Sequence, residues 1–340
     1  MNATSRPQGH PSDKARGASR RAVLAGAAML CMLGAGAASA EEDFPSKPIT
    51  IIAHTGAGSS TDIFARELAR AAEPLLGQPI VIENRPGGSG AAQMSALKLA
   101  KPNGYTIGVN TLSHLTAMQT NLKGSFAWDD FSWIVLNQLD PYAIVVRSDS
   151  EYKTLKDLVE DAKKKGGTLN VGGFGTVGSA HNIAFNLFAD AAGFKFNWVP
   201  FEGGSQAMTA LLGGHIDVVN TNPGPMLQFA EANRVRPLGV LSKTRIDSMP
   251  DTPTLAEAGY DLGTTWQQIR GIYGPKGIPM DIQKKLADAF LQAMKRPEFV
   301  KYMKASGQIA GDLGPEEYTA FIAEQNELAK TWLDKLGATQ

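Results

Sequence analysis

The chain has 340 residues, of which 43% are hydrophobic and 19% charged, and its 33 basic residues balance its 33 acidic ones. This composition is typical of a soluble globular protein, and the length exceeds that of a single compact core, so we expect two lobes. Residues 1–40 hold five basic residues and one acidic residue, which leaves 28 basic and 32 acidic residues beyond them. This mildly acidic remainder lacks the basic field that nucleic-acid binding requires.

The first 40 residues predict a cleavable export signal. A basic segment ends in Arg20-Arg21, an apolar stretch follows, and the small residues Ala38-Ser39-Ala40 precede Glu41. A membrane anchor is disfavoured because glycines dilute a stretch already short for roughly 30 Å of hydrocarbon. The arginine pair resembles a twin-arginine signal and is equally compatible with ordinary secretion.

The only cysteine, Cys31, lies within this signal. Lipid attachment there is disfavoured because Leu30, the residue before it, is not small. The mature chain then has no cysteine, which excludes disulfides, thiol nucleophiles and cysteine metal sites from it.

A strand expected at residues 49–53 leads into the first loop (residues 54–59). The sequence here is His54-Thr55-Gly56-Ala57-Gly58-Ser59-Ser60-Thr61-Asp62, and a helical pattern follows. A strand that ends in glycines and restarts as a hydroxyl-capped helix directs free N–H groups and the positive end of a helix dipole to one place. Such a place favours an anion.

The same arrangement recurs in the second loop (residues 172–179). A strand at 169–171 precedes Gly172-Gly173-Phe174-Gly175-Thr176-Val177-Gly178-Ser179, and a helix begins near His181. Two such loops, one in each half of the chain, predict a cleft that holds one small anion from both sides.

Strands and helices alternate along the rest of the chain, which is the rhythm of parallel α/β sheets. The first helix should stop or kink near Glu73, before Pro74. The other strands are expected at 79–83, 105–110, 196–199, 216–220, 236–241 and 268–273. The other helices are expected up to residue 100 and at 154–166, 181–191, 205–212, 226–232, 280–294, 297–306 and 315–336.

Two extended stretches, near residues 140–146 and 262–272, are expected to cross between the lobes. We therefore predict an α/β fold of two lobes joined by two hinge strands, with an export signal at 1–40. Lobe 1 comprises 41–143 and 265–340, and lobe 2 comprises 144–264. A two-strand hinge allows closure around a ligand.

Catalytic alternatives have weaker support. The pattern Gly173-x-Gly175-x-x-Gly178, with Glu202 as a ribose acid, would suit a nucleotide cofactor, although Glu202 comes later than the usual spacing. No P-loop lysine, Gly-x-Ser-x-Gly motif or metal-binding histidine spacing is present. An exported nucleotide-dependent enzyme stays open as the alternative function.

The chain resembles the Bug or TctC family of extracytoplasmic solute receptors, the binding components of tripartite tricarboxylate transporters. The resemblance covers nearly the whole mature chain. It rests on the following motifs: Phe44-Pro45-Ser46-Lys47-Pro48-Ile49, Gly58-Ser59-Ser60-Thr61-Asp62, Val81-Ile82-Glu83-Asn84-Arg85-Pro86-Gly87, Pro102-Asn103-Gly104-Tyr105-Thr106, Leu212-Gly213-Gly214-His215-Ile216-Asp217 and Pro250-Asp251-Thr252-Pro253-Thr254-Leu255-Ala256-Glu257-Ala258-Gly259. It implies a two-lobed periplasmic binding fold (Venus flytrap) that traps a carboxylate and delivers it to membrane transporter subunits.

Three departures from the family pattern bear on the ligand. Thr55-Gly56 replaces an aromatic-proline pair, Val177 stands where a glycine is usual, and Thr221-Asn222 replaces a frequent Asp-Asn. Without that acid the site should disfavour a free amino group. We expect a dicarboxylate, a tricarboxylate or an aromatic carboxylate.

We expect a periplasmic, monomeric receptor that has no catalytic residue, cofactor or metal and binds no nucleic acid. Phe174 is expected to close over an apolar part of the ligand, and His181 to donate a hydrogen bond to the anion. The candidate ligand-binding residues are Ala57, Gly58, Ser59, Ser60, Thr61, Asn110, Phe174, Gly175, Thr176, Gly178, Ser179, His181, Thr221 and Asn222.

Overall fold

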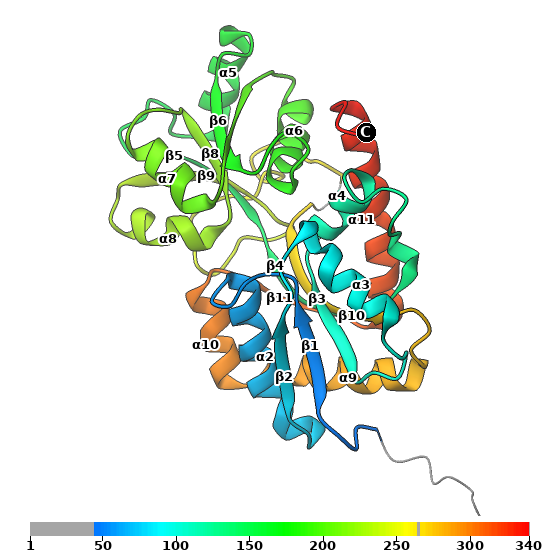
Figure 1. Cartoon of the computed structure of the whole chain (residues 1–340). Coiled ribbons are helices and arrows are strands. Elements are labelled where there is room, and N and C mark those ends of the chain that lie inside the picture. Colours follow the sequence, from blue (N-terminus) through cyan, green and yellow to red (C-terminus); the bar gives the residue numbers. More distant parts are fainter. Residues whose placement is uncertain (1–43, 264–265, 340) are drawn as a thin grey trace, which may run out of the picture. The chain divides into compact units, whose positions relative to one another are not determined.

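The computed structural model describes residues 44–263 and 266–339, which form two β-sheets with helices packed against them (Figure 1). The export signal expected at 1–40 lies outside the described residues. Within the described part of the chain, no helix is both long and apolar enough to cross a membrane.

The first sheet has six strands in the order β11-β4-β10-β3-β1-β2. Strand β1 pairs in parallel with β2 and β3, as the strand and helix rhythm predicts. Strand β10 runs antiparallel to β3 and β4, and β11 runs antiparallel to β4. The strands are β1 (Ile49–Ala53), β2 (Ile80–Asn84), β3 (Thr106–Asn110), β4 (Phe131–Asp140), β10 (Gln268–Pro275) and β11 (Ile309–Leu313).

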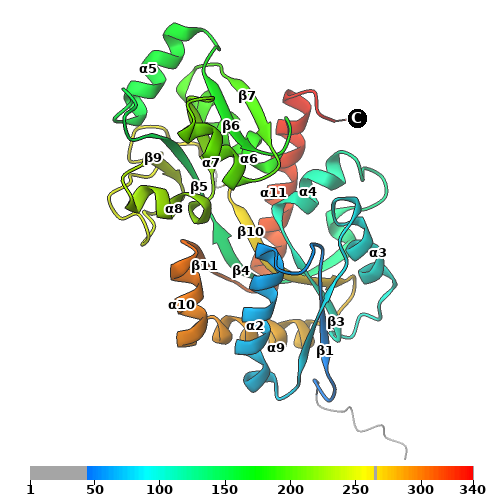
Figure 2. The same ribbon diagram turned by 60° about the vertical axis from the view of Figure 1, so that its left-hand side comes forward.

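The helices of the first sheet pack in two groups (Figure 2). Helix α2 contacts α9 and α10, whereas α11 packs on β4 and α4, and α3 on β3 and β10. On the side of α11, the buried rings of Trp133 and Tyr273 stack with centroids 5.1 Å apart, and Trp133 also contacts the ring of Tyr318. The helices are α2 (Ser60–Leu76), α3 (Ala91–Leu99), α4 (Leu112–Gln119), α9 (Met280–Ala293), α10 (Pro297–Ala305) and α11 (Pro315–Lys335), with single 3₁₀ turns at η1 (Gly88–Gly90) and η2 (Trp128–Asp130).

The second sheet has five strands in the order β7-β6-β8-β5-β9. Strand β6 is parallel to β7 and β8, and β5 is antiparallel to β8 and β9. The strands are β5 (Tyr142–Arg147), β6 (Asn170–Phe174), β7 (Asn197–Phe201), β8 (Val218–Thr221) and β9 (Val235–Leu241). The helices are α5 (Leu155–Lys165), α6 (Ala180–Ala192), α7 (Gly204–Leu212) and α8 (Pro223–Glu231).

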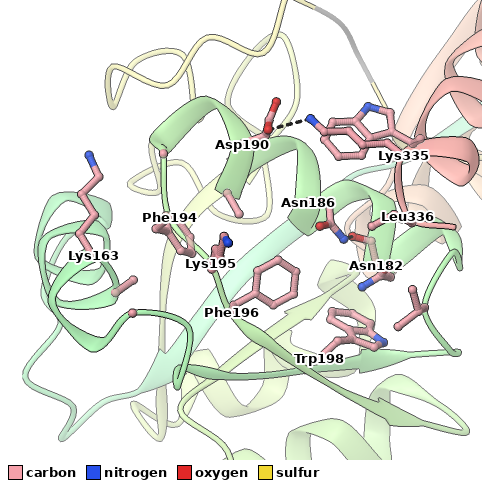
Figure 3. A pocket seen from close by; sticks show the side chains of 16 residues that line it. Lys163, Asn182, Asn186, Asp190, Phe194, Lys195, Phe196, Trp198, Lys335 and Leu336 are labelled. Atoms are coloured by element: carbon pink, nitrogen blue, oxygen red, sulfur yellow. Dashed lines mark hydrogen bonds and ion pairs between the residues drawn. The ribbon is translucent and has the colours of Figure 1, made fainter.

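The chain passes from the first sheet to the second at Pro141, between β4 and β5, and returns between β9 and β10. The end of α11 makes a further link, because Lys335 Nζ lies 2.7 Å from Asp190 Oδ1 on α6 (Figure 3). The lobe boundaries stay predictions. Strand β5 begins at Tyr142, two residues before the first boundary, and the second boundary falls at 264–265, outside the described residues.

The end predicted for the first helix and the end predicted for the strand at 169–171 were wrong. Helix α2 continues through Pro74 to Leu76, because a proline in the last turn removes one hydrogen bond and the Gly77 N–H closes the helix on Glu73 O at 2.9 Å. Strand β6 runs to Phe174, so Gly172 and Gly173 pair with β7 before the turn begins.

Candidate functional site

In the first loop, Ser59 is the N-cap of α2, as the sequence predicts. Its Oγ accepts the Asp62 N–H at 3.2 Å. The positive φ of Gly58, 79°, lets the Gly58 N–H donate to the Asp62 carboxylate at 2.8 Å. The N–H groups of Ser60 and Thr61, the first two of α2, have no acceptor among the described residues. They lie at the positive end of the helix dipole.

The second loop has the same geometry. Ser179 is the N-cap of α6, and its Oγ accepts the Asn182 N–H at 3.3 Å. Gly178, with φ of 84°, donates its N–H to Asn182 Oδ1 at 3.0 Å. The N–H groups of Ala180 and His181 likewise find no acceptor in the described part of the chain. Each loop therefore presents two free helix N–H groups to an anion.

The two loops differ in charge. Asp62 is ion-paired with Arg66 at 2.9 Å, and the Arg66 guanidinium lowers the pKa of Asp62 to about 2. The equivalent pair on α6 is the neutral Asn182 and Asn186, which are joined by a 2.9 Å hydrogen bond from Asn186 Nδ2 to Asn182 O. The first loop thus carries an acid whose charge is balanced, and the second carries none.

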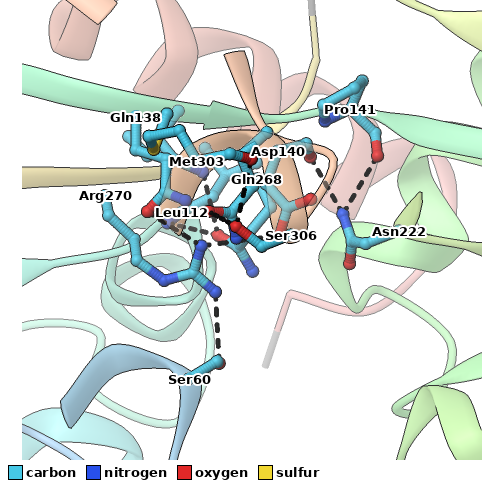
Figure 4. A network of polar contacts seen from close by, with 12 residues as sticks. Ser60, Leu112, Gln138, Asp140, Pro141, Asn222, Gln268, Arg270, Met303 and Ser306 are labelled. Carbon is cyan, nitrogen blue, oxygen red and sulfur yellow. Dashed lines mark hydrogen bonds and ion pairs between the residues drawn. The ribbon is translucent and has the colours of Figure 1, made fainter. Parts of the chain in front are cut away.

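A chain of polar contacts at the hinge connects the two helix starts, and Figure 4 shows its part from Ser60 to Asn222. Arg270 Nη2 donates to Ser60 Oγ at 3.1 Å, and its Nη1 lies 3.4 Å from Asp140 Oδ2. Asn222 Nδ2 donates to Asp140 O at 2.9 Å, and Asn222 Oδ1 pairs with His181 Nε2 at 3.0 Å. This chain of contacts links α2 of the first sheet to α6 of the second.

Burial raises the pKa of Asp140 to about 6, against the opposing effect of Arg270. Several other buried polar atoms close to this network have no hydrogen-bond partner among the described residues. They are Asp140 Oδ1, Arg270 Nε, Gln138 Nε2, Tyr142 Oη and Thr221 Oγ1. Each unpaired buried donor or acceptor lowers the stability of the fold by about 1–3 kcal/mol, so a polar ligand that pairs with these atoms would be bound favourably.

His181 is buried between the rings of Tyr142 and Phe174, at centroid distances of 4.7 and 5.6 Å. Burial lowers its pKa to about 4, so the ring is neutral at physiological pH. Asn222 Oδ1 can only accept, so the single proton of the His181 ring is on Nε2 and is donated to Asn222. The ring could donate this proton to an anion only if its hydrogen bond to Asn222 were broken.

The candidate residues differ in exposure. Phe174, 42% exposed, ends β6, whereas Asn110 is fully buried and accepts from Tyr318 Oη at 2.8 Å. Five are exposed (Ala57, Gly58, Ser60, Phe174, Thr176), four are half-buried (Ser59, Gly175, Ser179, Asn222) and five are buried (Thr61, Asn110, Gly178, His181, Thr221). The structure thus gathers the first-loop residues around α2 and the second-loop residues, with Asn222, around α6.

Sequence reasoning missed Arg270 and Asp140. The available signal was a charged residue inside the apolar strand Ile269-Arg270-Gly271-Ile272, together with an acid that ends a second apolar strand. A lone buried charge needs a partner, so the two could have been paired.

His114, which lies near the first loop, has a structural role. His114 Nδ1 accepts the Thr111 N–H at 3.1 Å, and its Nε2 pairs with Gln93 Oε1 at 2.9 Å. Within residues 44–263 and 266–339, no group of three or more His, Cys, Asp or Glu side chains is placed to hold a metal ion.

A cavity of about 810 Å³ lies behind the second loop, among α5, α6, β7 and the end of α11 (Figure 3). Phe196, Trp198 and Trp332 line it, and Lys335 pairs with Asp190 at its edge. Trp198 Nε1 donates to Gly175 O at 2.9 Å, so this wall supports the second loop from outside. None of the candidate ligand-binding residues is among the described residues that line the cavity.

Two α/β sheets between which the chain crosses twice, each with a helix start that has free N–H groups for an anion, define a two-lobed periplasmic binding fold. The model of the tripartite tricarboxylate transporter family receptor, TctC, matches residues 64–338, and the chain belongs to this family.

Relatives agree with this assignment. The chain is 32% identical over 321 residues to the UPF0065 protein in the gbd 5′ region of Cupriavidus necator, covering 93% of this chain and 96% of that one. It matches the crystal structure of a TctC solute-binding protein from Polaromonas, without ligand, with a TM-score of 0.78 and 29% identity over 86% of this chain and all (100%) of that one. Rhodopseudomonas palustris MatC with bound malate has a TM-score of 0.68 at 24% identity, covering 85% and 100% of the two chains, and shares the fold.

The protein is therefore a TctC-type periplasmic solute-binding protein and not an enzyme. The alternative of a nucleotide-dependent enzyme was wrong. The glycine pattern that suggested it has structural causes: Gly173 lies under the Trp198 ring, and Gly175 and Gly178 adopt positive φ in the turn.

Proposed function

We propose that the protein captures a small organic carboxylate between its first and second loops and delivers it to a tripartite tricarboxylate-type membrane transporter. One observation carries the proposal: both loops cap a helix with serine and leave the first two helix N–H groups free. A carboxylate accepts such N–H groups and gains from both helix dipoles. The fold can hold a dicarboxylate, as malate-bound MatC illustrates.

The charges of the site favour an acid over an amino acid. An ammonium group is held best by a carboxylate whose charge is not already balanced, but Arg66 balances the charge of Asp62 and Arg270 balances that of Asp140. Asn222, near the second loop, is neutral. The ligand classes we propose are dicarboxylates, tricarboxylates and aromatic carboxylates, with Phe174 against the apolar part.

Closure follows from the same geometry. A ligand that contacts both loops stabilises only the arrangement that brings them together, so closure requires binding at both. We propose that the receptor acts as a monomer after export through the signal at residues 1–40, and that transporter subunits recognise the closed form.

A thermal-shift screen of residues 41–340 tests the proposal. The compounds are citrate, C4 to C8 dicarboxylates, benzoate, phthalate isomers, acidic amino acids and NAD. A ligand at 100 times its dissociation constant adds about 2.7 kcal/mol to the folded state, which raises the melting temperature measurably. A shift with one class of carboxylate supports the proposal, and a shift with NAD or amino acids alone contradicts it.

A further inference from the structure

Arg270 is a buried cation with an incomplete set of acceptors. It lies in β10 of the first sheet and is 5% exposed. Its Nη1 meets Gln138 Oε1 at 3.2 Å and Asp140 Oδ2 at 3.4 Å, and its Nη2 meets Ser60 Oγ at 3.1 Å. Its Nε has no acceptor among the described residues.

Asp140 is an imperfect partner for this guanidinium. A carboxylate best satisfies arginine through two parallel bonds, but here one oxygen makes one long contact and Asp140 Oδ1 has no donor in the described part of the chain. Both side chains are buried, so water does not supply the hydrogen bonds that this pair lacks. An anion that pairs better with the guanidinium could therefore replace Asp140.

Arg270 also lies at the first loop. Its contact, Ser60, is exposed and is the first residue of α2, whose N–H is free. The pKa of His54, in the same loop, is lowered to about 4, mainly by burial and further by the Arg270 charge. The Arg270 guanidinium and the N-terminus of α2 thus lie next to each other at Ser60, and both favour an anion there.

We propose that Arg270 is a specificity-determining residue: it receives one carboxylate of a ligand that carries at least two, and that carboxylate displaces Asp140. This inference rests on the proposed function and narrows it to dicarboxylates and tricarboxylates. The ligand's other carboxylate binds the free N–H groups of the second loop. A monocarboxylate cannot satisfy both places.

The displaced Asp140 then needs a proton. Its other neighbours are Tyr142 on β5, Tyr302 on α10, and the neutral Gln308 and Asn222, so among the described residues no second cation acts on it. A buried carboxylate without a cation is neutral at equilibrium. Ligand binding therefore takes up one proton from solvent, and affinity falls as the pH rises, by at most tenfold per unit.

Three forms of the mature protein test this inference: wild type, Asp140→Asn, and the double variant Arg270→Gln/Asp140→Asn. The double variant leaves no unpaired buried charge, whereas Asp140→Asn leaves the Arg270 guanidinium with neutral partners only and should be less stable than wild type. Calorimetry measures binding of succinate, glutarate, adipate and suberate, each against its monoamide, between pH 6 and pH 8.5. A single cooperative melting transition in the absence of ligand shows that each variant folds.

We expect wild type to bind at least one diacid at least tenfold more tightly than its monoamide and to lose affinity as the pH rises. Asp140→Asn should bind that diacid about tenfold more tightly at pH 8 and lose the pH dependence. The double variant should bind diacid and monoamide within about threefold of each other.

The inference fails if the double variant still prefers the diacid, or if Asp140→Asn changes neither affinity nor pH dependence. Binding of monocarboxylates alone would also overturn it while leaving the proposed function intact. If no carboxylate binds wild type, the proposed function fails together with the inference. Lys195→Gln, in the cavity behind the second loop, is a control that should leave diacid binding unchanged.

Discussion

Asp62 and Asn182 hold equivalent places in two matching helix starts. Each lies four residues after a glycine of positive φ and accepts that glycine's N–H, at 2.8 Å from Gly58 and 3.0 Å from Gly178. The backbone geometry at the start of the helix is the same in both lobes. The acceptor is charged in Asp62 and neutral in Asn182, so a substitution at either position can change the charge of the site while keeping this geometry.

Asn182→Asp should weaken anion binding about tenfold, because it places an unbalanced negative charge beside the second loop. In α2 the equivalent acid is balanced by Arg66, four residues later, where α6 has Asn186. The double variant Asn182→Asp/Asn186→Arg rebuilds that pair and should recover most of the affinity. Calorimetry with the best carboxylate of the screen measures both, and equal loss in the two variants would contradict this account.

Substitution of the two loop glycines separates backbone strain from crowding. Gly58 and Gly178 have φ of 79° and 84°, so alanine is strained at either position. A Cβ at Gly58 meets nothing within 4 Å, whereas at Gly178 it lies 2.9 Å from Leu333 and 3.0 Å from Ala338.

Gly58→Ala should therefore lower the free energy of unfolding by about 1 kcal/mol, and Gly178→Ala by about 2–3 kcal/mol. Urea denaturation measures the difference. Equal losses would show that the end of α11 does not pack on the second loop in solution.

Phe174→Ala should affect binding more than stability. The residue is 42% exposed and its ring contacts that of His181, so its removal should lower the free energy of unfolding by about 1 kcal/mol. If it covers the apolar part of the ligand, affinity for a long or aromatic carboxylate should fall by roughly tenfold or more. Affinity for a short acid such as succinate should change less, and an equal change for both ligands would argue against this role.

The Asp62 pair predicts how the fold responds to acid. Its pKa is lowered from 3.8 to about 2, chiefly by the Arg66 hydrogen bond, so the ionised carboxylate stabilises the folded state. This contribution is complete above about pH 4 and is lost as the pH falls toward 2. Asp62→Asn should therefore lose less stability than wild type between pH 4 and pH 2 in urea denaturation. Parallel curves for the two proteins would contradict the assignment.

Local patterns predicted the elements that local chemistry determines. The serine N-caps, the alternation of strands and helices and the helix predicted at 154–166 are all present. Helix α4 was missed because most of its residues are buried, which leaves no polar face to reveal its period. Strand β11 was missed because its short sequence, with Gly311 and Asp312, becomes a strand only by pairing with β4.

The contact between Arg270 and Asp140 could not be predicted from the spacing of residues along the sequence. Arg270 and Asp140 are 130 positions apart and meet because β4 and β10 are paired. The side-chain partner of His181 is likewise distant in the chain: Asn222, the N-cap of α8, is 41 positions away. Long-range pairing of this kind is set by the whole sheet, whereas each serine cap depends on a few neighbouring residues.

The most direct test of the central claim is calorimetric titration of one carboxylate into wild type, Ser59→Ala, Ser179→Ala and the double variant. Each serine supports its loop, so each single variant should weaken the same ligand by about 1–2 kcal/mol. Because one ligand contacts both loops, the loss of affinity in the double variant should be at least as large as the larger of the two single losses. If either single variant binds like wild type, the ligand does not lie between the two loops, and the account is wrong.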